Sequence, residues 1–393
     1  MKVAFALENP LRYGGGVSMV VRTLMEALPD AYRFLLISPD EPASLRQDPL
    51  FQRMDKHIPW HPDKNPPHAE FYQTTRQVLP QLVLAQPDLV HFHSGGVFSW
   101  GNRWPGASWP ASLRKHHIPC VWTNHLVVDL FHGYCGDRKP FWFKLAMLPI
   151  SYFAKSLQLA ATQVELCDSD HDAENIRRWY FPFKNKVTRI YISRIEEPSI
   201  SFSLRPREKM ILAVGHLAFR KGHHILVQAF AKIRVSYPDW KLVLVGPESA
   251  DGCGEWIRKY CQEKSLGAWI TLAGDREDAR DWMKRCSLFA QPSLQEALGL
   301  ALQEALACGC ACVGTKAGGI PELILDRVNG RLVDPGDVGQ LVEALRELIG
   351  NEDLRSQYGR AGVKHIRALG MSREAMVEAH EKIYRGTISP GIV

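Results

Sequence analysis

Two glutamates in the second half of the chain are the side chains best spaced to hold a ligand. Glu296 and Glu304 lie eight residues apart in the segment PSLQEALGLALQEALACG, residues 292–309. If Gly299 begins a helix, Glu296 precedes that helix and Glu304 lies inside it. Over a full helix the two carboxylates would be ~12 Å apart, too far to act together on one bond.

Carboxylates at that separation can hold the two ends of an elongated ligand whose charged middle rests on the helix N-terminus between them. A nucleotide sugar has this shape, with sugar hydroxyls, a diphosphate and ribose hydroxyls in a row. The alternative is an ordinary amphipathic helix with two acids facing solvent. Spacing alone leaves both interpretations open.

Two glycine turns add groups that suit an anion. Glycines at 14–16 separate a predicted strand from a predicted helix, where the backbone can approach a ligand closely. They do not complete a GxGxxG dinucleotide fingerprint. After Gly215, the sequence VGHLAFRKGHH places Arg220 and Lys221 before another predicted helix. Paired cations beside a helix N-terminus suit a diphosphate, although such residues are also common on solvated loops.

Short apolar runs alternate with helical stretches throughout the chain, which predicts parallel sheets with right-handed crossovers. The predicted strands are 3–7, 34–37, 89–93, 120–123 and 164–167, then 210–214, 242–245, 270–272, 288–290 and 310–313. The fold class is therefore α/β, with two doubly wound, Rossmann-like domains facing across a cleft. We predict an N-terminal domain over 1–196, a linker over 197–208, a C-terminal domain over 209–371 and a final segment over 372–393. Ligands should bind at the carboxyl ends of the strands.

Composition limits the class of protein. The 393 residues are 46% hydrophobic and 23% charged, as in a globular chain, and the net charge of +6 with no long basic run gives no reason to expect nucleic acid. The nine cysteines include no CxxC, and we predict no metal. The sequence shows no signal peptide and no run of ~20 apolar residues, so we expect a cytoplasmic protein that is not integral to a membrane.

The segment around the two glutamates resembles the E-x7-E motif of the retaining glycosyltransferases of family 4, which have the GT-B fold. The resemblance is dense from 210 to 337 and thinner before 200. It is carried by Pro292-Ser293, Glu296, Gly299-Leu300, Glu304-Ala305, Cys308-Gly309, Gly318–Glu322, Asn329-Gly330 and Val333–Asp337, and upstream by Gly215–Leu217, Lys221-Gly222, Gly14–Gly16, His91–Ser94 and Thr123–His125.

The resemblance implies three sets of site residues and no cofactor. The catalytic set is Glu296, His125, Lys221 and Arg220. The donor-binding set is Gly15, Gly16, Gly215, His216, Lys221, Gly299, Leu300 and Glu304. The acceptor-side set is His93, His125 and Asp129. It also implies that residues 372–384 cross back to the first domain.

Within these sets, the resemblance implies that Glu304 binds the ribose hydroxyls, Glu296 binds the hydroxyls of the donor sugar and Lys221 binds the diphosphate. One position departs from the pattern, because His216 stands where the donor loop usually carries arginine. Arg220 is the candidate to supply the missing charge.

Two other features have simpler interpretations than catalysis. His91 and His93 end a predicted strand, where we expect them to point to opposite sheet faces and to pack or contact a hydroxyl rather than bind a metal. The sequence Asp168-Ser169-Asp170 looks like a metal-binding DxD, but we interpret it as the N-cap of a helix over 172–179.

The stretch Arg138–Lys144 places three aromatics among three cations, and residues 145–157 continue with apolar side chains and Lys155. Rings and cations of this kind suit an anionic membrane surface. A helix that packs its aromatics on the first sheet is the alternative, and Pro149 should interrupt any long regular helix.

These observations predict a retaining, metal-independent glycosyltransferase of hexosyltransferase type. It would move a sugar from a nucleotide-diphosphate sugar to a glycan or lipid-linked acceptor, in envelope glycolipid, polysaccharide or lipopolysaccharide synthesis. Peripheral contact with the inner face of the membrane is part of this prediction. The alternatives are an epimerase or phosphorylase on the same scaffold and a non-catalytic protein that binds a nucleotide sugar.

Overall fold

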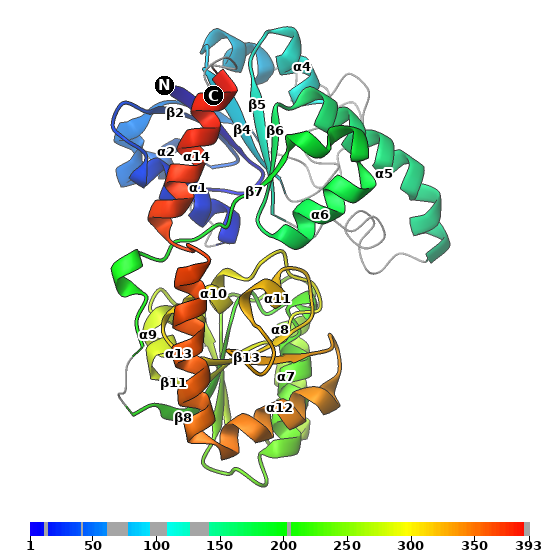
Figure 1. Cartoon of the computed structure of the whole chain (residues 1–393), viewed down its shortest axis with the longest axis vertical. Helices are drawn as coiled ribbons and strands as arrows, with labels where there is room; N and C mark the ends of the chain where they lie inside the picture. Colours follow the sequence, from blue (N-terminus) through cyan, green and yellow to red (C-terminus); the bar gives the residue numbers. More distant parts are fainter. Residues whose placement is uncertain are drawn as a thin grey trace. The chain divides into compact units, whose positions relative to one another are not determined.

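The computed structural model describes residues 1–11, 15–40, 42–60, 78–94, 108–125, 141–202 and 206–388. The chain forms two compact units, shown in Figure 1. Unit 1 comprises Met1–Arg194 together with Arg373–Val393, and unit 2 comprises Ile195–Ser372. Each unit is an open parallel sheet with helices on both faces, which confirms the predicted α/β class.

Seven described strands form the sheet of unit 1, in the order β3-β2-β1-β4-β5-β6-β7. Their bounds are β1 Lys2–Leu7, β2 Arg33–Ser38, β3 Met54–Pro59, β4 Leu89–Ser94, β5 Cys120–Asn124, β6 Val164–Cys167 and β7 Val187–Arg189. All pairs are parallel, with Phe5 of β1 beside Leu36 of β2 and His91 of β4. The inner strands are almost wholly buried, as continuous apolar runs require.

Helices and short 3-10 turns cover the sheet of unit 1. They are α1 Gly16–Ala27, α2 Pro42–Leu45, α4 Trp109–Lys115, α5 Phe141–Ala161, α6 Asp170–Trp179, α14 Arg373–Ile388, η1 Pro49–Arg53 and η3 Phe181–Lys186. Helix α5 contains Pro149, so the expectation that this proline would interrupt the helix is wrong. A proline removes one backbone hydrogen bond but does not prevent a 21-residue helix from continuing.

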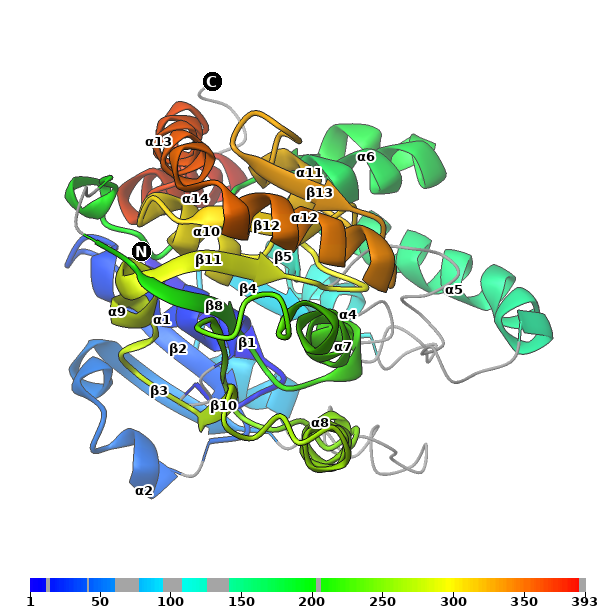
Figure 2. The same cartoon turned by 90° about the horizontal axis from the view of Figure 1, so that it is seen from below.

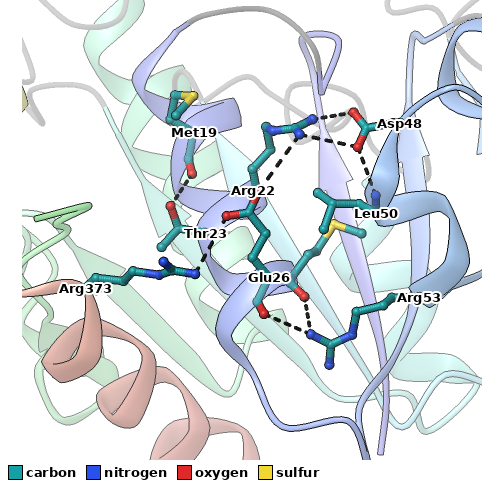
Figure 3. Close-up of polar contacts among 9 residues, drawn as sticks. Met19, Arg22, Thr23, Glu26, Asp48, Leu50, Arg53 and Arg373 are labelled. Carbon is teal, nitrogen blue, oxygen red and sulfur yellow. Dashed lines mark hydrogen bonds and ion pairs between the residues drawn. The ribbon is translucent and has the colours of Figure 1, made fainter. Parts of the chain in front are cut away.

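The last described helix, α14, follows unit 2 in sequence but belongs to unit 1. It packs beside α1 and β4 (Figure 1), and Arg373 at its start lies 3.8 Å from Glu26 of α1 (Figure 3). Tyr384 in its fourth turn is fully buried. The core of unit 1 is therefore built from both ends of the chain.

Unit 2 holds six described strands in the order β10-β9-β8-β11-β12-β13, all parallel (Figure 2). Their bounds are β8 Glu208–Val214, β9 Lys241–Val245, β10 Ile270–Gly274, β11 Cys286–Gln291, β12 Ala311–Thr315 and β13 Gly330–Val333. The helices and turns are α7 His223–Ile233, α8 Cys253–Glu263, α9 Ala279–Arg285, α10 Leu300–Ala307, α11 Ile320–Leu323, α12 Val338–Gly350, α13 Glu352–Ala368, η4 Glu197–Ser199 and η5 Phe219–Lys221.

The chain enters unit 2 at Ile195, and the described residues of the predicted 197–208 linker lie in that unit. The amide of Ser201 donates to the carbonyl of Ala307, 3.0 Å away. The Arg207 guanidinium donates to the carbonyls of Met283, Cys286 and Cys308. Residues 197–202 and 206–208 are thus hydrogen-bonded parts of unit 2.

The C-terminal end of α1 is closed by one arginine. The Arg53 guanidinium donates to the carbonyls of Met25 at 2.6 Å, Leu28 at 2.7 Å and Pro29 at 2.8 Å, and stands 5.1 Å from the Phe34 ring. Figure 3 shows Arg53 reaching the end of α1. A cation here satisfies carbonyls that the helix leaves without partners and opposes the negative end of the helix dipole.

We expect Arg53→Leu to lower the free energy of unfolding of unit 1 by about 2–3 kcal/mol, since charged hydrogen bonds to partly buried carbonyls are lost. Urea denaturation of the full chain measures this. Arg33→Leu is the control, because the side chain of Arg33 is exposed and pairs with Asp55, and its loss should cost less than about 1 kcal/mol. Equal midpoints for the two variants would contradict the capping role.

Candidate active site

The loop after β8 is shaped by two glycines in the left-handed region. Gly215 has φ +146° and Gly222 has φ +71°. A Cβ at Gly222 would lie 1.8 Å from the carbonyl oxygen of Pro292, so only glycine fits there. The carbonyl of Arg220 accepts a 2.8 Å hydrogen bond from the amide of Leu294. The loop over 215–222 is thereby fixed against the segment that follows β11.

Three donors converge on one oxygen of Glu296. Its Oε2 accepts from Lys221 Nζ at 2.6 Å, Gln291 Nε2 at 3.0 Å and Ser293 Oγ at 3.0 Å. The residue is 8% exposed. In turn, Thr315 at the end of β12 donates to the carbonyl of Ser293 at 2.6 Å. The carboxylate is therefore held by the ends of β11 and β12 and by the loop after β8.

The charges around Glu296 are predominantly positive. Burial alone would raise the pKa of Glu296, but the charge and hydrogen bond of Lys221, with the charge of Arg220, hold the pKa below its ordinary value. Burial lowers the pKa of His216, and the charges of Arg220 and Lys221 lower it further. Glu296 is thus an anion at neutral pH, and His216 is neutral among cations.

Helix α10 begins where the sequence predicted, with Gly299 as its N-cap at φ +103°. Glu296 lies in the preceding loop and Glu304 inside the helix, 5% exposed. Gly318 fits against this loop, because a Cβ there would lie 1.6 Å from the carbonyl oxygen of Glu296. The alternative of two solvent-facing acids on an amphipathic helix is wrong for both glutamates, since both are buried.

Unit 1 gathers three polar side chains at the carboxyl ends of neighbouring strands. His93 is in β4, His125 follows β5 and Asp168 follows β6. His125 Nδ1 lies 2.8 Å from Asp168 Oδ2, and His125 Nε2 lies 2.9 Å from His93 Nδ1. His93 and Asp168 are each 1% exposed.

His91 and His93 lie on the same face of the sheet, with ring centroids 4.0 Å apart, so the expectation of opposite faces is wrong. Residues two apart in a strand share a face, and only adjacent residues alternate. His91 lies 2.7 Å from the Tyr384 hydroxyl and 2.6 Å from that of Thr123, which confirms the expected hydroxyl contact. The N-cap interpretation is also confirmed, because Ser169 Oγ accepts from the amide of Asp172 at 3.2 Å.

The structure divides the predicted site residues between the units. Unit 2 holds Gly215, His216, Arg220, Lys221, Glu296, Gly299, Leu300 and Glu304. Unit 1 holds Gly15, Gly16, His93 and His125. Gly15 is the N-cap of α1 in extended conformation and Gly16 is the first helical residue, so neither uses a left-handed φ. Asp129 lies outside the described residues.

Sequence reasoning missed the roles of three side chains. Gln291 and Ser293 hold Glu296, and Asp168 holds His125. Ser293 and Asp168 stand in segments that the sequence had singled out for other reasons. Gln291 ends a buried strand, and no sequence motif marked it as a site residue.

Two family models match the chain, and together they reach across both units. The model described as "Glycosyltransferase Family 4" matches residues 14–192, and the model described as "Glycosyl transferases group 1" matches residues 195–365. The chain belongs to the group 1, family 4 glycosyltransferases.

Among curated relatives, an N-acetyl-α-D-glucosaminyl L-malate synthase of Bacillus anthracis is 29% identical over 197 residues, covering 50% of each chain. The chain spans about half the length of the curated relatives it matches. Solved structures align over nearly the whole chain. A sucrose-phosphate synthase of Thermosynechococcus elongatus has a TM-score of 0.79 at 20% identity, covering 99% of each chain.

A second solved structure, the Anabaena protein HepE in complex with UDP and glucose, has a TM-score of 0.74 at 16% identity. The alignment covers 98% of the chain described here and 100% of the HepE chain. At these identities the likeness establishes the fold. The two Rossmann-like units of this chain have the GT-B fold, as the resemblance implied.

Helix α5 carries a surface distinct from these clusters. Trp142, Leu145 and Phe153 are 68%, 51% and 61% exposed, and Phe181 in the adjacent η3 is 65% exposed. In both views α5 extends outward from the sheet of unit 1 (Figures 1 and 2). No helix among the described residues combines the length and hydropathy needed to cross a bilayer.

Lys155 does not contribute to this surface, although the sequence analysis counted it there. It is 1% exposed, is hydrogen-bonded to Glu165, and lies 5.8 Å from the centre of the Trp122 ring. An internal carboxylate of this kind needs a cation beside it, so Lys155 faces inward.

Proposed function

We propose that the protein is a retaining glycosyltransferase that moves a sugar from a nucleotide-diphosphate sugar to an acceptor hydroxyl without a metal ion. The observation that carries the proposal is the buried Glu296, held by Lys221, Gln291 and Ser293 just before the N-terminus of α10. A buried carboxylate beside a cation and a helix N-terminus offers an acceptor for hydroxyls next to a site for phosphate.

The donor would lie along this arrangement. The hydrogen bonds described for Glu296 all use Oε2, so its Oε1 would accept from the donor sugar. Lys221 and the amides at Gly299 and Leu300 would bind the diphosphate, with Gly215 and His216 lining the loop beside it. Glu304 would accept from the ribose hydroxyls. Family membership and the nucleotide-bound relative support a donor of this class.

The chemistry would depend on stabilising the leaving group. Negative charge grows on the diphosphate as the glycosidic bond breaks, and cations held in place before the reaction lower that barrier. Lys221 is held by Glu296 at 2.6 Å, and Arg220 is close enough to lower the pKa of that carboxyl. We propose that Arg220 supplies the charge that His216 does not. The acceptor would attack from the face that the diphosphate leaves, and the diphosphate would take its proton.

Unit 1 would supply the acceptor side. We propose that His93, His125 and Asp129 belong to the acceptor side and that Gly15 and Gly16 belong to the donor-binding set. We propose that the donor domain spans residues 209–371. The acceptor domain would span residues 1–196 and include the final segment 372–393.

A nucleotide-release assay tests the proposed reaction. Candidate nucleotide sugars are first ranked by how far each raises the melting temperature, since a ligand that binds only the folded state stabilises it. The best donor is then incubated with and without glycan and lipid-linked acceptors. Acceptor-dependent nucleotide release, with the anomeric configuration kept in the product, is the expected result. Release without any acceptor would favour an epimerase, and turnover that depends on free phosphate would favour a phosphorylase. Binding without turnover would favour a non-catalytic protein.

We further propose that the α5 surface rests on the cytoplasmic face of an anionic membrane, where a lipid-linked or growing envelope glycan would be the acceptor. Exposed rings at Trp142, Phe153 and Phe181 suit the headgroup region. Lys184 lies 4.6 Å from the Phe181 ring, and the sequence of α5 holds no acid. Each cation near such a surface can contribute ~1 kcal/mol.

We expect the protein to float with anionic vesicles at low salt and to float less at high salt. A variant with Trp142, Phe153 and Phe181 changed to serine should stay at the bottom of the gradient. Leu84→Ser is the matched control, because Leu84 is 81% exposed in the same unit but outside α5 and η3. Failure of the parent protein to float would sink the membrane proposal and favour a soluble acceptor.

A further inference from the structure

His125 is held at both ring nitrogens by its neighbours in the sheet. Asp168 Oδ2 lies 2.8 Å from Nδ1, and His93 Nδ1 lies 2.9 Å from Nε2. The His93 and His125 rings are nearly parallel, at 8°. Since β4, β5 and β6 are adjacent, the three side chains come from consecutive strand ends. The ring has one orientation that satisfies both contacts.

The hydrogens in this array follow from the chemistry of the groups. An ionised carboxylate only accepts, so the bond to Asp168 requires a hydrogen on His125 Nδ1. In a neutral imidazole the other nitrogen then carries the lone pair. His93 Nδ1 must donate to it. Burial lowers the pKa of His93 well below its ordinary value, and the neighbouring His91 and His125 lower it further, so His93 is neutral and able to serve as this donor.

Burying the carboxylate of Asp168 at this place should destabilise the fold, so stability alone does not account for this residue. It is 1% exposed, and among the described residues its Oδ1 has no hydrogen-bond partner. A buried carboxylate costs free energy unless its charge is used. The helix N-cap that follows is provided by Ser169, not by Asp168. The interaction that uses the charge of Asp168 is the one with His125.

A row of aromatic side chains packs behind His93. The His91 ring lies 4.0 Å from that of His93, and the Phe5 ring is 5.8 Å from it. His91 is itself fixed at both nitrogens by the hydroxyls of Tyr384 and Thr123. Helix α14 therefore supports the array through Tyr384.

We propose that Asp168 is a positioning residue that fixes His125 in the Nδ1–H tautomer, which leaves the Nε2 lone pair free to accept a hydrogen bond from a hydroxyl of the acceptor other than the one that attacks. This rests on the proposed function for the identity of the hydroxyl, but not for the tautomer. In the free protein His93 occupies the lone pair. That hydroxyl replaces His93 there, and the bond to Asp168 keeps the ring oriented as it does so.

The test combines histidine ¹⁵N spectra with steady-state kinetics on the full chain. In the parent, His125, identified by the signal lost in His125→Gln, should show a protonated Nδ1 and an unprotonated Nε2. In Asp168→Asn the amide can donate to Nδ1, so a substantial fraction should change to the Nε2–H tautomer. The kcat should fall by about 100-fold, as expected when a positioned group is misplaced, with the KM for the donor little changed.

Two variants make the result specific. Asp170→Asn removes a second negative charge from the same helix start, where Asp170 is half-exposed and pairs with Arg189, and it should keep the parent tautomer and rate. His93→Phe keeps a ring beside His91 and removes the donor to Nε2, and it should keep the Nδ1–H tautomer because Asp168 alone imposes it.

An unchanged tautomer in Asp168→Asn, or a changed one in His93→Phe, would overturn the proposal. If Asp168→Asn does not fold, the His93→Phe spectrum still shows whether Asp168 or His93 sets the tautomer of His125. The spectra require no turnover. A parent protein that shows the expected tautomer but transfers no sugar would therefore refute the proposed function and leave the assignment of Asp168 intact.

Discussion

Replacing Glu296 by alanine should slow sugar transfer by about 100-fold or more, the range found when one preorganised electrostatic group is removed from a transition state. Without Oε2, Lys221 loses the contact that holds its ammonium group at 2.6 Å, and Gln291 and Ser293 lose their shared acceptor. The affinity for the free nucleotide should change little, because Glu296 is assigned to the sugar. Initial rates and calorimetric titration with the nucleoside diphosphate separate the two effects.

The control for this substitution is Glu343→Ala, which removes an exposed glutamate of α12 that pairs with Arg346 three residues on. It should match the parent in both measurements. Glu296→Gln is informative as well, since it keeps an oxygen in place but removes the charge. A Glu296→Ala variant with parental kcat would show that the convergence of donors on this carboxylate is structural.

Glu304→Ala should have the complementary effect. A charged hydrogen bond is worth about 1.5–3 kcal/mol, so losing the contact to the ribose should weaken nucleotide binding by about 10- to 150-fold. The side chain is 5% exposed in α10. Titration with nucleoside diphosphate measures the loss, with Glu343→Ala again as the control. Equal affinity in the two variants would remove Glu304 from the donor site.

The parts of the fold that the sequence predicted are those that carry a continuous apolar run or a glycine turn. The inner strands β1, β4, β8 and β11 were predicted because both of their faces are buried. Three of the described edge strands, β3, β7 and β13, were missed, whereas the edge strand β10 was predicted over 270–272. Strands β3 and β13 each contain adjacent residues that are partly exposed, so neither is a continuous buried run, and β7 has only three residues. Helix α13 was missed because its sequence is mostly polar and only one side of it packs.

Site residues were predicted where a local pattern marked them and missed where the contact is long-range. Gly299 and Ser169 are the N-caps of α10 and α6, and the sequence predicted a helix start at each of them. The bond from Asp168 to His125 joins residues 43 positions apart, and no local pattern encodes it. Fold topology decides such pairs, because it sets which strand ends are neighbours.

The place of α14 has a consequence for how the protein is made on the ribosome. The strands of unit 1 are synthesised first, but Tyr384, which is fully buried against His91, leaves the ribosome only after all of unit 2. At 5–20 residues per second, translation from Arg194 to Arg373 takes about 10–35 s. Unit 2 is contiguous and can fold during that time. Until then the nascent unit 1 lacks the helix that covers His91 of β4. The contact that fixes His91 is therefore completed by a segment made after unit 2.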